Sequence, residues 1–384
     1  MKWVFLIIKK KKQDLYNFKL GKIGLIINLN SNIEYNYPIH KSKLLENIRD
    51  SHYYNGVIQC LVNIKPLKHI FLNRSELVNS GIVDKEIVDN NIIDKKTGKK
   101  KVDKNVQNKK LITMNFYKLI QYMWLIGNTN KNSEDYNGNQ ANIFLSEIQS
   151  ISKDKELLNK IHYLIRFLLL SMHCEQILNE NNQHKINYNL KELKKNFNEI
   201  KNTFITDLFF FELEKPKCCK NTCSINYMLV YEIGDFHKKA NEKQAINIET
   251  ILSQANMKLL CNNCKKESKS TTKFISLPKI LIIVLISNKD NNITFYYNNK
   301  LDISKYISGK AKINNSNYNL ISLIKKHEKG FITFCKASGK NDNWFKYIET
   351  ETVQNIKNFD SFNCVKETTN IPYLLIYQQS NHFY

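Results

Sequence analysis

The sequence predicts an α+β fold, with helices in its first half and strands in its second. Apolar residues recur at helical spacing over 53–64 and 117–126, and most strongly over 155–178. Residues 274–285 form an alternating and then continuous β-type run, and short strands and turns follow as far as Tyr377. A chain that separates its helices from its strands in this way is typical of an α+β architecture.

The first 40 residues read as an N-terminal extension of short strands and turns. Trp3–Ile8 is an apolar stretch of only six residues, and lysines occupy positions 9–12 directly after it. A secretory signal needs a longer apolar region followed by small residues, and a membrane-spanning helix needs about 20 apolar residues. We therefore expect an N-terminal strand here, no membrane association, and a cytoplasmic or nuclear protein.

The chain of 384 residues carries a formal net charge of +23, which attracts nucleic acid, acidic proteins or anionic surfaces. Lysine supplies almost all of this charge, because arginine occurs only at positions 49, 74 and 166. Proteins that read nucleic acid usually use arginine for bidentate contacts, so the charge alone is weak evidence for such a function. Nine of the lysines fall within 82–110, which we predict to be a solvated basic insertion.

The cysteines favour a reduced compartment and one metal site over a disulfide framework. Their number, nine, is odd, and five of them lie in two tight clusters. They are Cys60, Cys174, Cys218, Cys219, Cys223, Cys261, Cys264, Cys335 and Cys364.

The two clusters have the spacing of a zinc site. Cys261 and Cys264 form a C-x-x-C pair, and Cys219 and Cys223 lie about forty residues earlier. Two such pairs can hold one Zn²⁺ in a tetrahedral four-thiolate site, with Cys218 as an alternative to Cys219. The competing interpretation is five free cysteines in surface loops. A four-thiolate site has no open coordination position, so the metal would be structural.

Residues 44–61 resemble the cysteine box of the ubiquitin-specific proteases, which reads G-L-x-N-L-G-N-T-C-Y-M-N-S-x-L-Q-x-L. In this register the family's nucleophile position falls on His52. Asn47 matches the residue whose side chain helps to stabilise the oxyanion in the family. The other matching residues of the box are Tyr53, Asn55, Gln59 and Leu61.

Further motifs follow in the family's order, up to about residue 378. Arg166–Glu175, with His173, resembles a helix ending in L-L-x-x-L-H-x-E. Ile205–Phe209 with Leu213 resembles the segment before the first zinc knuckle, and counting from Leu213 favours Cys219 as the ligand. The later matches are Leu277–Leu281, Leu301–Tyr306, Trp344–Glu349 and Pro372–Tyr377.

The resemblance implies a papain-like cysteine-protease fold of the ubiquitin-specific protease type. Such a domain has a helical thumb, a β palm, and zinc-bearing β fingers that grip ubiquitin. It would occupy 41–380, with the thumb at about 44–200, the fingers at about 204–275 and the palm at about 276–380.

The triad positions implied by the resemblance hold no catalytic residue. The family's G-H-Y-x-A-Y falls on 330–335, which puts Phe331 at the position of the base, and the orienting position falls on Ile348. Cleavage of this type needs a thiolate, an imidazole that takes the thiol's proton, and a third group that fixes the imidazole. With His52, Phe331 and Ile348 in these places no covalent mechanism is left, so we expect a pseudoenzyme whose site is filled in and packed.

Two other cysteines, Cys60 and Cys335, are candidates to replace the missing nucleophile. Cys60 is expected in the thumb helix, facing the core, and Cys335 on a palm strand near Phe331, without an evident base. His327 is an unaligned candidate base that reads more simply as a loop or strand-end histidine. His173 reads as a helix-end packing residue.

Three functions stay open at this point. The first is a binding or assembly module in ubiquitin-related or ribonucleoprotein processes. The second is an active cysteine-type deubiquitinase, and the third is a basic nucleic-acid-binding scaffold. The expected partners are accordingly ubiquitin or a ubiquitin-like protein, or a protein or ribonucleoprotein complex. The strong positive charge opposes capture of ubiquitin's basic C-terminal tail.

Overall fold

The described part of the chain lies within one compact unit, Tyr35–Asn381, and a second unit, 1–34 with 382–384, is not described. The N-terminal extension, the insertion 82–110 and Asn47 therefore lie outside the description. The computed structural model describes residues 52–73, 111–124, 140–154, 160–180, 186–197, 202–214, 225–234, 246–254, 259–260, 267–268, 273–286, 295–309, 311, 315–327, 330–337, 343–348, 354–356 and 372–380.

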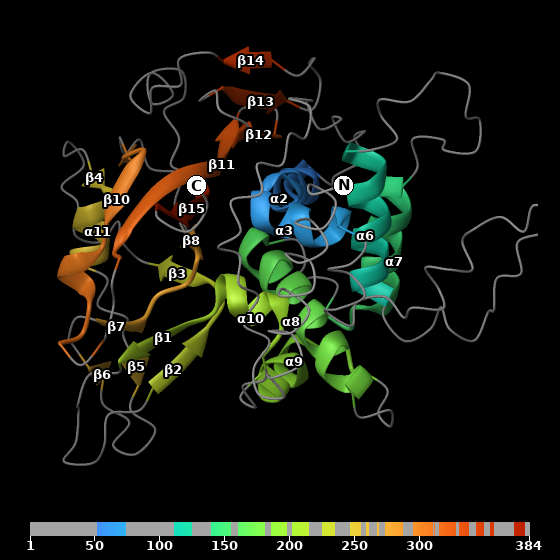
Figure 1. Cartoon of the computed structure of the whole chain (residues 1–384), viewed down its shortest axis with the longest axis horizontal. Coiled ribbons are helices and arrows are strands. Elements are labelled where there is room, and N and C mark those ends of the chain that lie inside the picture. Colours follow the sequence, from blue (N-terminus) through green and yellow to red (C-terminus); the bar gives the residue numbers. More distant parts are fainter. Residues whose placement is uncertain are drawn as a thin grey trace, which may run out of the picture. The chain divides into compact units, whose positions relative to one another are not determined.

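Helices come first along the chain and strands later, which confirms the predicted α+β class (Figure 1). The predicted helix over 53–64 is α2 (His52–Asn63), and the one over 155–178 contains α8 (Ile161–Glu180). The helix predicted over 117–126 begins earlier, as α6. The remaining helices of this layer are α3 (Lys65–Leu72), α6 (Leu111–Trp124), α7 (Gln140–Ile151), α9 (Leu190–Phe197) and α10 (Phe204–Phe209).

The main sheet has eight strands, in the order β14-β13-β12-β11-β15-β8-β3, with β10 paired to β11 beside this path. All neighbours are antiparallel except β3 and β8, which run parallel. The strands are β3 (Tyr231–Gly234), β8 (Ile280–Ile286), β10 (Lys300–Asp302), β11 (Asn317–His327), β12 (Gly330–Lys336), β13 (Trp344–Ile348), β14 (Gln354–Ile356) and β15 (Pro372–Gln379).

A second, three-stranded sheet has the order β2-β1-β7, and two short pairs, β4 with β9 and β5 with β6, complete the strands. The predicted β run over 274–285 is divided between β7 and β8 by Leu277 and Pro278, as the proline indicated. The elements are β1 (Phe211–Glu214), β2 (Ile225–Met228), β4 (Ile246–Asn247), α11 (Ile248–Gln254), β5 (Leu259–Leu260), β6 (Glu267–Ser268), β7 (Lys273–Ser276), β9 (Phe295–Tyr296) and the 3₁₀ turn Ser304–Tyr306.

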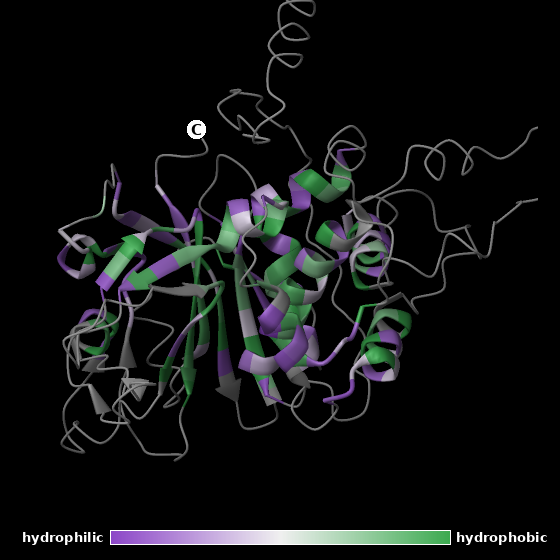
Figure 2. Cartoon of the chain, turned by 90° about the horizontal axis from the view of Figure 1, so that it is seen from below, coloured by the Kyte–Doolittle hydropathy of each residue, from purple (hydrophilic) through white to green (hydrophobic). Residues whose placement is uncertain are grey.

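Strand β8 is buried on both faces, which explains its continuous apolar sequence. Ile280, Ile282 and Val284 belong to a first core cluster shared with the helical layer. Leu281 and Ile283 alternate with them and belong to a second cluster on the opposite face. In Figure 2 hydrophobic residues are frequent on the central strands, while the helices carry both hydrophobic and hydrophilic residues.

The sheet therefore separates two cores. The first lies between the sheet and helices α2, α3, α6, α7, α8, α9 and α10. The second contains residues of α11, β1, β7 and β10. Among the helices that the structure describes, none combines the length and apolar character that crossing a bilayer requires.

Candidate functional site

Helix α2 lies directly on strand β12, and a glycine permits the close approach. A Cβ atom at Gly56 would lie 3.0 Å from Thr333 Oγ1 and 3.2 Å from Ile324 Cδ1. Both distances are tighter than most contacts that a real Cβ makes. A side chain at position 56 would therefore require Thr333, Ile324 or the helix itself to shift by a few tenths of an ångström.

A second contact, one turn further along α2, shows how the helix and strand β12 run relative to each other. The Cys335 thiol donates a hydrogen bond to the backbone carbonyl oxygen of Gln59, with the sulfur and oxygen 3.6 Å apart. Gly56 thus lies beside Thr333, and Gln59 lies beside Cys335. The helix and the strand run in the same direction along their contact.

This pairing places the start of α2 at the same end of the contact as Phe331. Four residues of helix, from Gly56 back to His52, cover about 6 Å. Two residues of strand, from Thr333 back to Phe331, cover about 6.6 Å. The backbone positions 52 and 331 are those that the resemblance gives to the nucleophile and the base; the side chain of His52 is outside the described residues.

Phe331 is half-buried and packs as an apolar residue on the helical side of the sheet. Its ring meets the ring of Tyr373 edge-on, with the centroids 5.6 Å apart and the planes at 85°. This geometry is favourable for two aromatic rings. A phenyl ring accepts no proton, so position 331 offers no general base.

Ile348 lies on the opposite face of the sheet from Phe331. It pairs directly with Ile332 across β12 and β13, and it packs against the second core cluster. The structure therefore places Phe331 and Ile348 on neighbouring strands but does not bring their side chains together. The expectation of one site filled jointly by both residues is corrected: Phe331 is held by Tyr373, and Ile348 belongs to the other core.

The two candidate rescue cysteines lie deeper along the same contact. Cys60 and Cys335 are both free thiols with 0% exposure. Burial, and next the neighbouring Cys335 thiol, raise the pKa of Cys60 well above its usual value. Cys60 is therefore a protonated core thiol, as expected for its place in the helix, and lacks the thiolate character that a nucleophile needs.

His173 and His327, the two histidines considered above, have positions that fit structural roles. His173 is fully buried in α8, its Nδ1 is 2.8 Å from Thr203 Oγ1, and its ring packs on Phe197. This confirms its reading as a packing residue. The backbone of His327 pairs with Gly330 at the turn between β11 and β12, which fits a strand-end histidine, and its side chain is not described.

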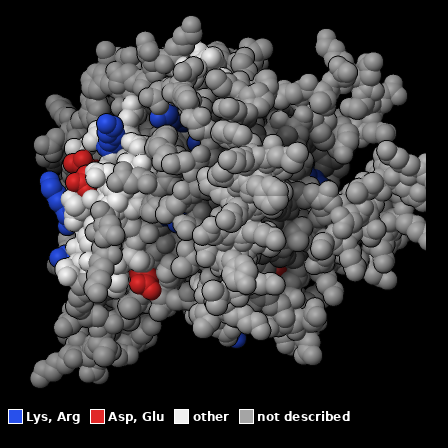
Figure 3. All heavy atoms as spheres, in the orientation of Figure 1, with Lys and Arg blue, Asp and Glu red and all other residues white. Residues whose placement is uncertain are grey.

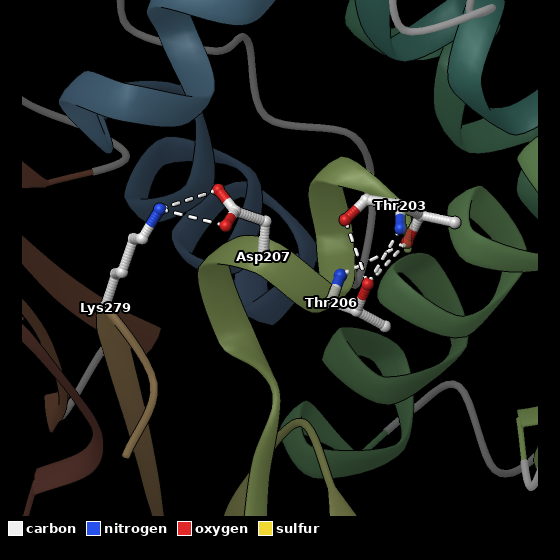
Figure 4. A network of polar contacts seen from close by, with 4 residues as sticks. All are labelled: Thr203, Thr206, Asp207 and Lys279. Carbon is white, nitrogen blue, oxygen red and sulfur yellow. Dashed lines mark hydrogen bonds and ion pairs between the residues drawn. The ribbon is translucent and has the colours of Figure 1, made fainter. Parts of the chain in front are cut away.

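Helix α10, which carries part of the family resemblance, is held by a polar network (Figure 4). The side chain of Thr203 accepts a hydrogen bond from the backbone N–H of Thr206, and the Thr206 hydroxyl accepts one from the N–H of Thr203. Such a capping box satisfies helix-start donors that would otherwise be unpaired. Asp207 forms an ion pair with Lys279 (2.8 Å), which joins α10 to the start of β8.

Sequence reasoning missed the role of Glu175, the last residue of the L-H-x-E match. Its carboxylate accepts hydrogen bonds from the backbone N–H of Ile112 (2.9 Å) and Thr113 (2.8 Å), and from the hydroxyls of Thr113 and Tyr188. Burial raises the pKa of this carboxyl, and the hydrogen bonds oppose the rise. Glu175 thus anchors the start of α6, a long-range contact with no local signal in the sequence.

The proposed zinc ligands Cys218, Cys219, Cys223, Cys261 and Cys264 lie outside the described residues. The strands around them are described. β1 and β2, paired antiparallel from Glu214 and Ile225, flank the first cluster, and β5 and β6, paired from Leu260 and Glu267, flank the second. Each cluster therefore lies in the connection of a β-hairpin, where two close cysteines can aim at one ion. Among the described residues, no group of three His, Cys, Asp or Glu side chains could hold a metal.

Comparison with solved structures shows the fold. The chain is similar to one in the structure of the SAGA Ubp8/Sgf11/Sus1/Sgf73 DUB module, with 18% identity, a TM-score of 0.56, and coverage of 90% of this chain and 69% of that chain. A yeast SAGA DUB module gives 18% identity, a TM-score of 0.54 and the same coverage. A third such module, bound to monoubiquitin, gives 15% identity, a TM-score of 0.57, and coverage of 98% and 76%.

These similarities establish the papain-like architecture of a ubiquitin-specific protease for this chain. No curated protein matches the sequence significantly. The family model described as ubiquitin carboxyl-terminal hydrolase matches residues 45–377, which is most of the chain. The chain therefore belongs to the ubiquitin carboxyl-terminal hydrolase family.

Proposed function

We propose that this protein is a catalytically inactive member of its family that acts as a binding or assembly module. The observation that carries the proposal is Phe331. The motif match gives position 331 to the family's base, and the ring of Phe331 packs on Tyr373. An uncharged aromatic residue there removes the group that would activate any nucleophile at the head of the helix.

The thiols near this contact support the same proposal. Cys60 lies eight residues, or about two helical turns, beyond position 52, and its thiol is buried and protonated. Cys335 points into the same packed contact, toward the carbonyl of Gln59. Neither thiol faces a described imidazole at the start of α2.

Ubiquitin or a multiprotein complex is the proposed partner. One structural neighbour is a module bound to monoubiquitin, and the neighbours are assemblies of four proteins. We infer that this chain offers a surface to such a partner. Its place would be the cytoplasm or the nucleus, which agrees with the free thiols of Cys60, Cys174 and Cys335.

One structural Zn²⁺, held by Cys219, Cys223, Cys261 and Cys264, is part of this proposal, with Cys218 as the alternative to Cys219. The two flanking hairpins support it. The metal would hold the two β connections together and would take no part in chemistry. Metal analysis of the purified protein should give one zinc per chain, and Cys261→Ser should abolish it, while Cys364→Ser should leave it in place.

The competing function is that of an active cysteine-type deubiquitinase, which membership of the family supports. Ubiquitin carrying a C-terminal electrophile separates the two. We expect no covalent adduct with this protein under conditions that label an active family member completely. An adduct on any cysteine, located by peptide mapping, would refute the inactive assignment.

A basic nucleic-acid-binding scaffold is the third function, supported by the charge of +23. On the face drawn in Figure 3, the described basic side chains stand in separate small groups with acidic ones among them, and not as one continuous basic surface. Titration of labelled ubiquitin and of a labelled RNA, each at low and high salt, would decide, because phosphate-driven binding falls steeply with salt.

A further inference from the structure

Two buried thiols face each other across the contact of α2 and β12. Cys60 projects from the helix and Cys335 from the strand, and both have 0% exposure. The sulfur of Cys335 is 3.6 Å from the carbonyl oxygen of Gln59, the residue directly before Cys60. Both side chains belong to the same core cluster, and the Cys335 thiol helps burial to raise the pKa of Cys60.

The backbone brings the pair together through Gly56. One turn before Cys60, the glycine lets the helix approach so closely that its missing Cβ would stand 3.0 Å from Thr333 Oγ1. A disulfide needs such an approach, since its two Cα atoms must lie within about 4.4–6.8 Å. A helix held at ordinary distance would keep thiols on the two elements apart.

We propose that Cys60 and Cys335 form an oxidation-controlled clamp, in which a peroxide-class oxidant joins them in a disulfide that fastens α2 to β12. One thiol attacks the peroxide, the O–O bond breaks, and a sulfenic acid and one water result. The second thiol then displaces the hydroxyl as a second water, and the S–S bond forms. Two thiols thus lose two protons and two electrons to one hydrogen peroxide.

The clamp acts on the thumb–palm joint, because α2 belongs to the helical layer and β12 to the main sheet. Burial raises the pKa of Cys60, so its thiolate is scarce while the joint is closed. Oxidation therefore proceeds through brief opening of the joint, and the disulfide then prevents further opening. The inference does not depend on whether the protein is a pseudoenzyme.

The test is oxidation of the full-length folded protein with hydrogen peroxide or diamide, followed by peptide mapping without reduction. We expect a peptide pair linked through Cys60 and Cys335, reversed by dithiothreitol. The midpoint of thermal unfolding should rise by roughly 5 °C on oxidation. Cys60→Ser and Cys335→Ser should each abolish both effects.

Cys174 provides a matched control, because it is also a free, buried helical thiol but hydrogen-bonds to the carbonyl of Leu193. Cys174→Ser should retain the linked pair and the shift. Mapping separates this link from oxidation of the other cysteines. The proposal fails if Cys60 and Cys335 react only with other partners, or if both stay reduced at every temperature up to unfolding.

Discussion

In α8, the buried carboxylate of Glu175 accepts hydrogen bonds from three residues, whereas at the start of the α2–β12 contact Phe331 stands at the position that the motif match gives to the family's base. Burying the Glu175 carboxylate costs desolvation free energy, which its hydrogen bonds offset, whereas Phe331 has no polar group to bury. Glu175 holds the start of α6, so its loss would damage the fold. Position 331 contributes apolar packing against Tyr373 and no polar group. The chain thus has a buried polar anchor where α8 meets α6, and an apolar residue at position 331.

The largest expected effect comes from removing the polar group of α8. Glu175→Ala leaves the buried N–H groups of Ile112 and Thr113 without their acceptor, and should destabilise the protein by about 4 kcal/mol. Glu175→Gln, which keeps one acceptor oxygen, should cost less. Urea unfolding followed by far-UV circular dichroism measures both. Equal stability of all three proteins would show that α6 starts without this anchor.

Lys68 is a second buried polar group of the helical layer, and it should make the stability of the protein depend on pH. Burial lowers its pKa from 10.5 to about 7, while contact with the Trp124 ring, 3.6 Å away, favours the charged form. Above pH 7 the Lys68 amine is protonated in the unfolded chain and largely neutral in the folded one. The free energy of unfolding should therefore rise with pH, by at most about 1.4 kcal/mol per pH unit. Below pH 7 the amine is protonated in both states, so its contribution to stability no longer changes with pH.

Unfolding midpoints measured between pH 7 and 9 test this slope. Lys68→Met should remove it, and Lys118→Met, at an exposed position of α6, should keep it. A slope that survives Lys68→Met must come from another group, and the buried amine would then be ruled out as its cause.

Gly56 tests the closeness of α2 to β12. Gly56→Val should destabilise the protein by roughly 2 kcal/mol, because the added atoms meet Thr333 and Ile324. Gly309, beside which a Cβ would find nothing within 4 Å, is the matched control, and Gly309→Val should have little effect. Similar losses in both variants would mean that the helix–strand contact is looser than described.

The smallest effect in free energy concerns positions 52 and 331, which we infer to lie at the same end of that contact. A thiol introduced by His52→Cys should be alkylated by iodoacetamide about tenfold faster at pH 6 when Phe331→His is added. An adjacent imidazolium lowers a thiol's pKa and raises its thiolate fraction. Site-specific alkylation, followed by mass spectrometry across pH, gives the two profiles. Superimposable profiles would show that the two positions do not meet.

The sequence was sufficient for features that repeat along the chain. Helical spacing predicted α2 and most of α8, and the apolar run broken at Pro278 predicted β7 and β8. The order of the family motifs predicted the architecture. All of these signals are local or are read in sequence order.

Contacts between distant segments could not be read in this way. The early start of α6 depends on Glu175, which lies 62 residues from Thr113. The faces on which Phe331 and Ile348 lie depend on strand register, which alternates with every residue, so matching each to a motif did not show that they point apart. The short α9 was missed although its buried residues Leu190, Leu193 and Phe197 recur at helical spacing.

Strand β8 has a consequence for the newly made chain. Its seven residues, Ile280–Ile286, are aliphatic and uncharged, and they reach their shielded state only when β15, β3 and both cores are in place. Segments of this kind self-associate when left open to solvent. β15 is the last described strand to emerge from the ribosome, so the edge of β8 that pairs with β15 stays unpaired until Pro372–Gln379 has been made. Fragments that end before Pro372 should therefore collect in inclusion bodies, while the whole chain stays soluble.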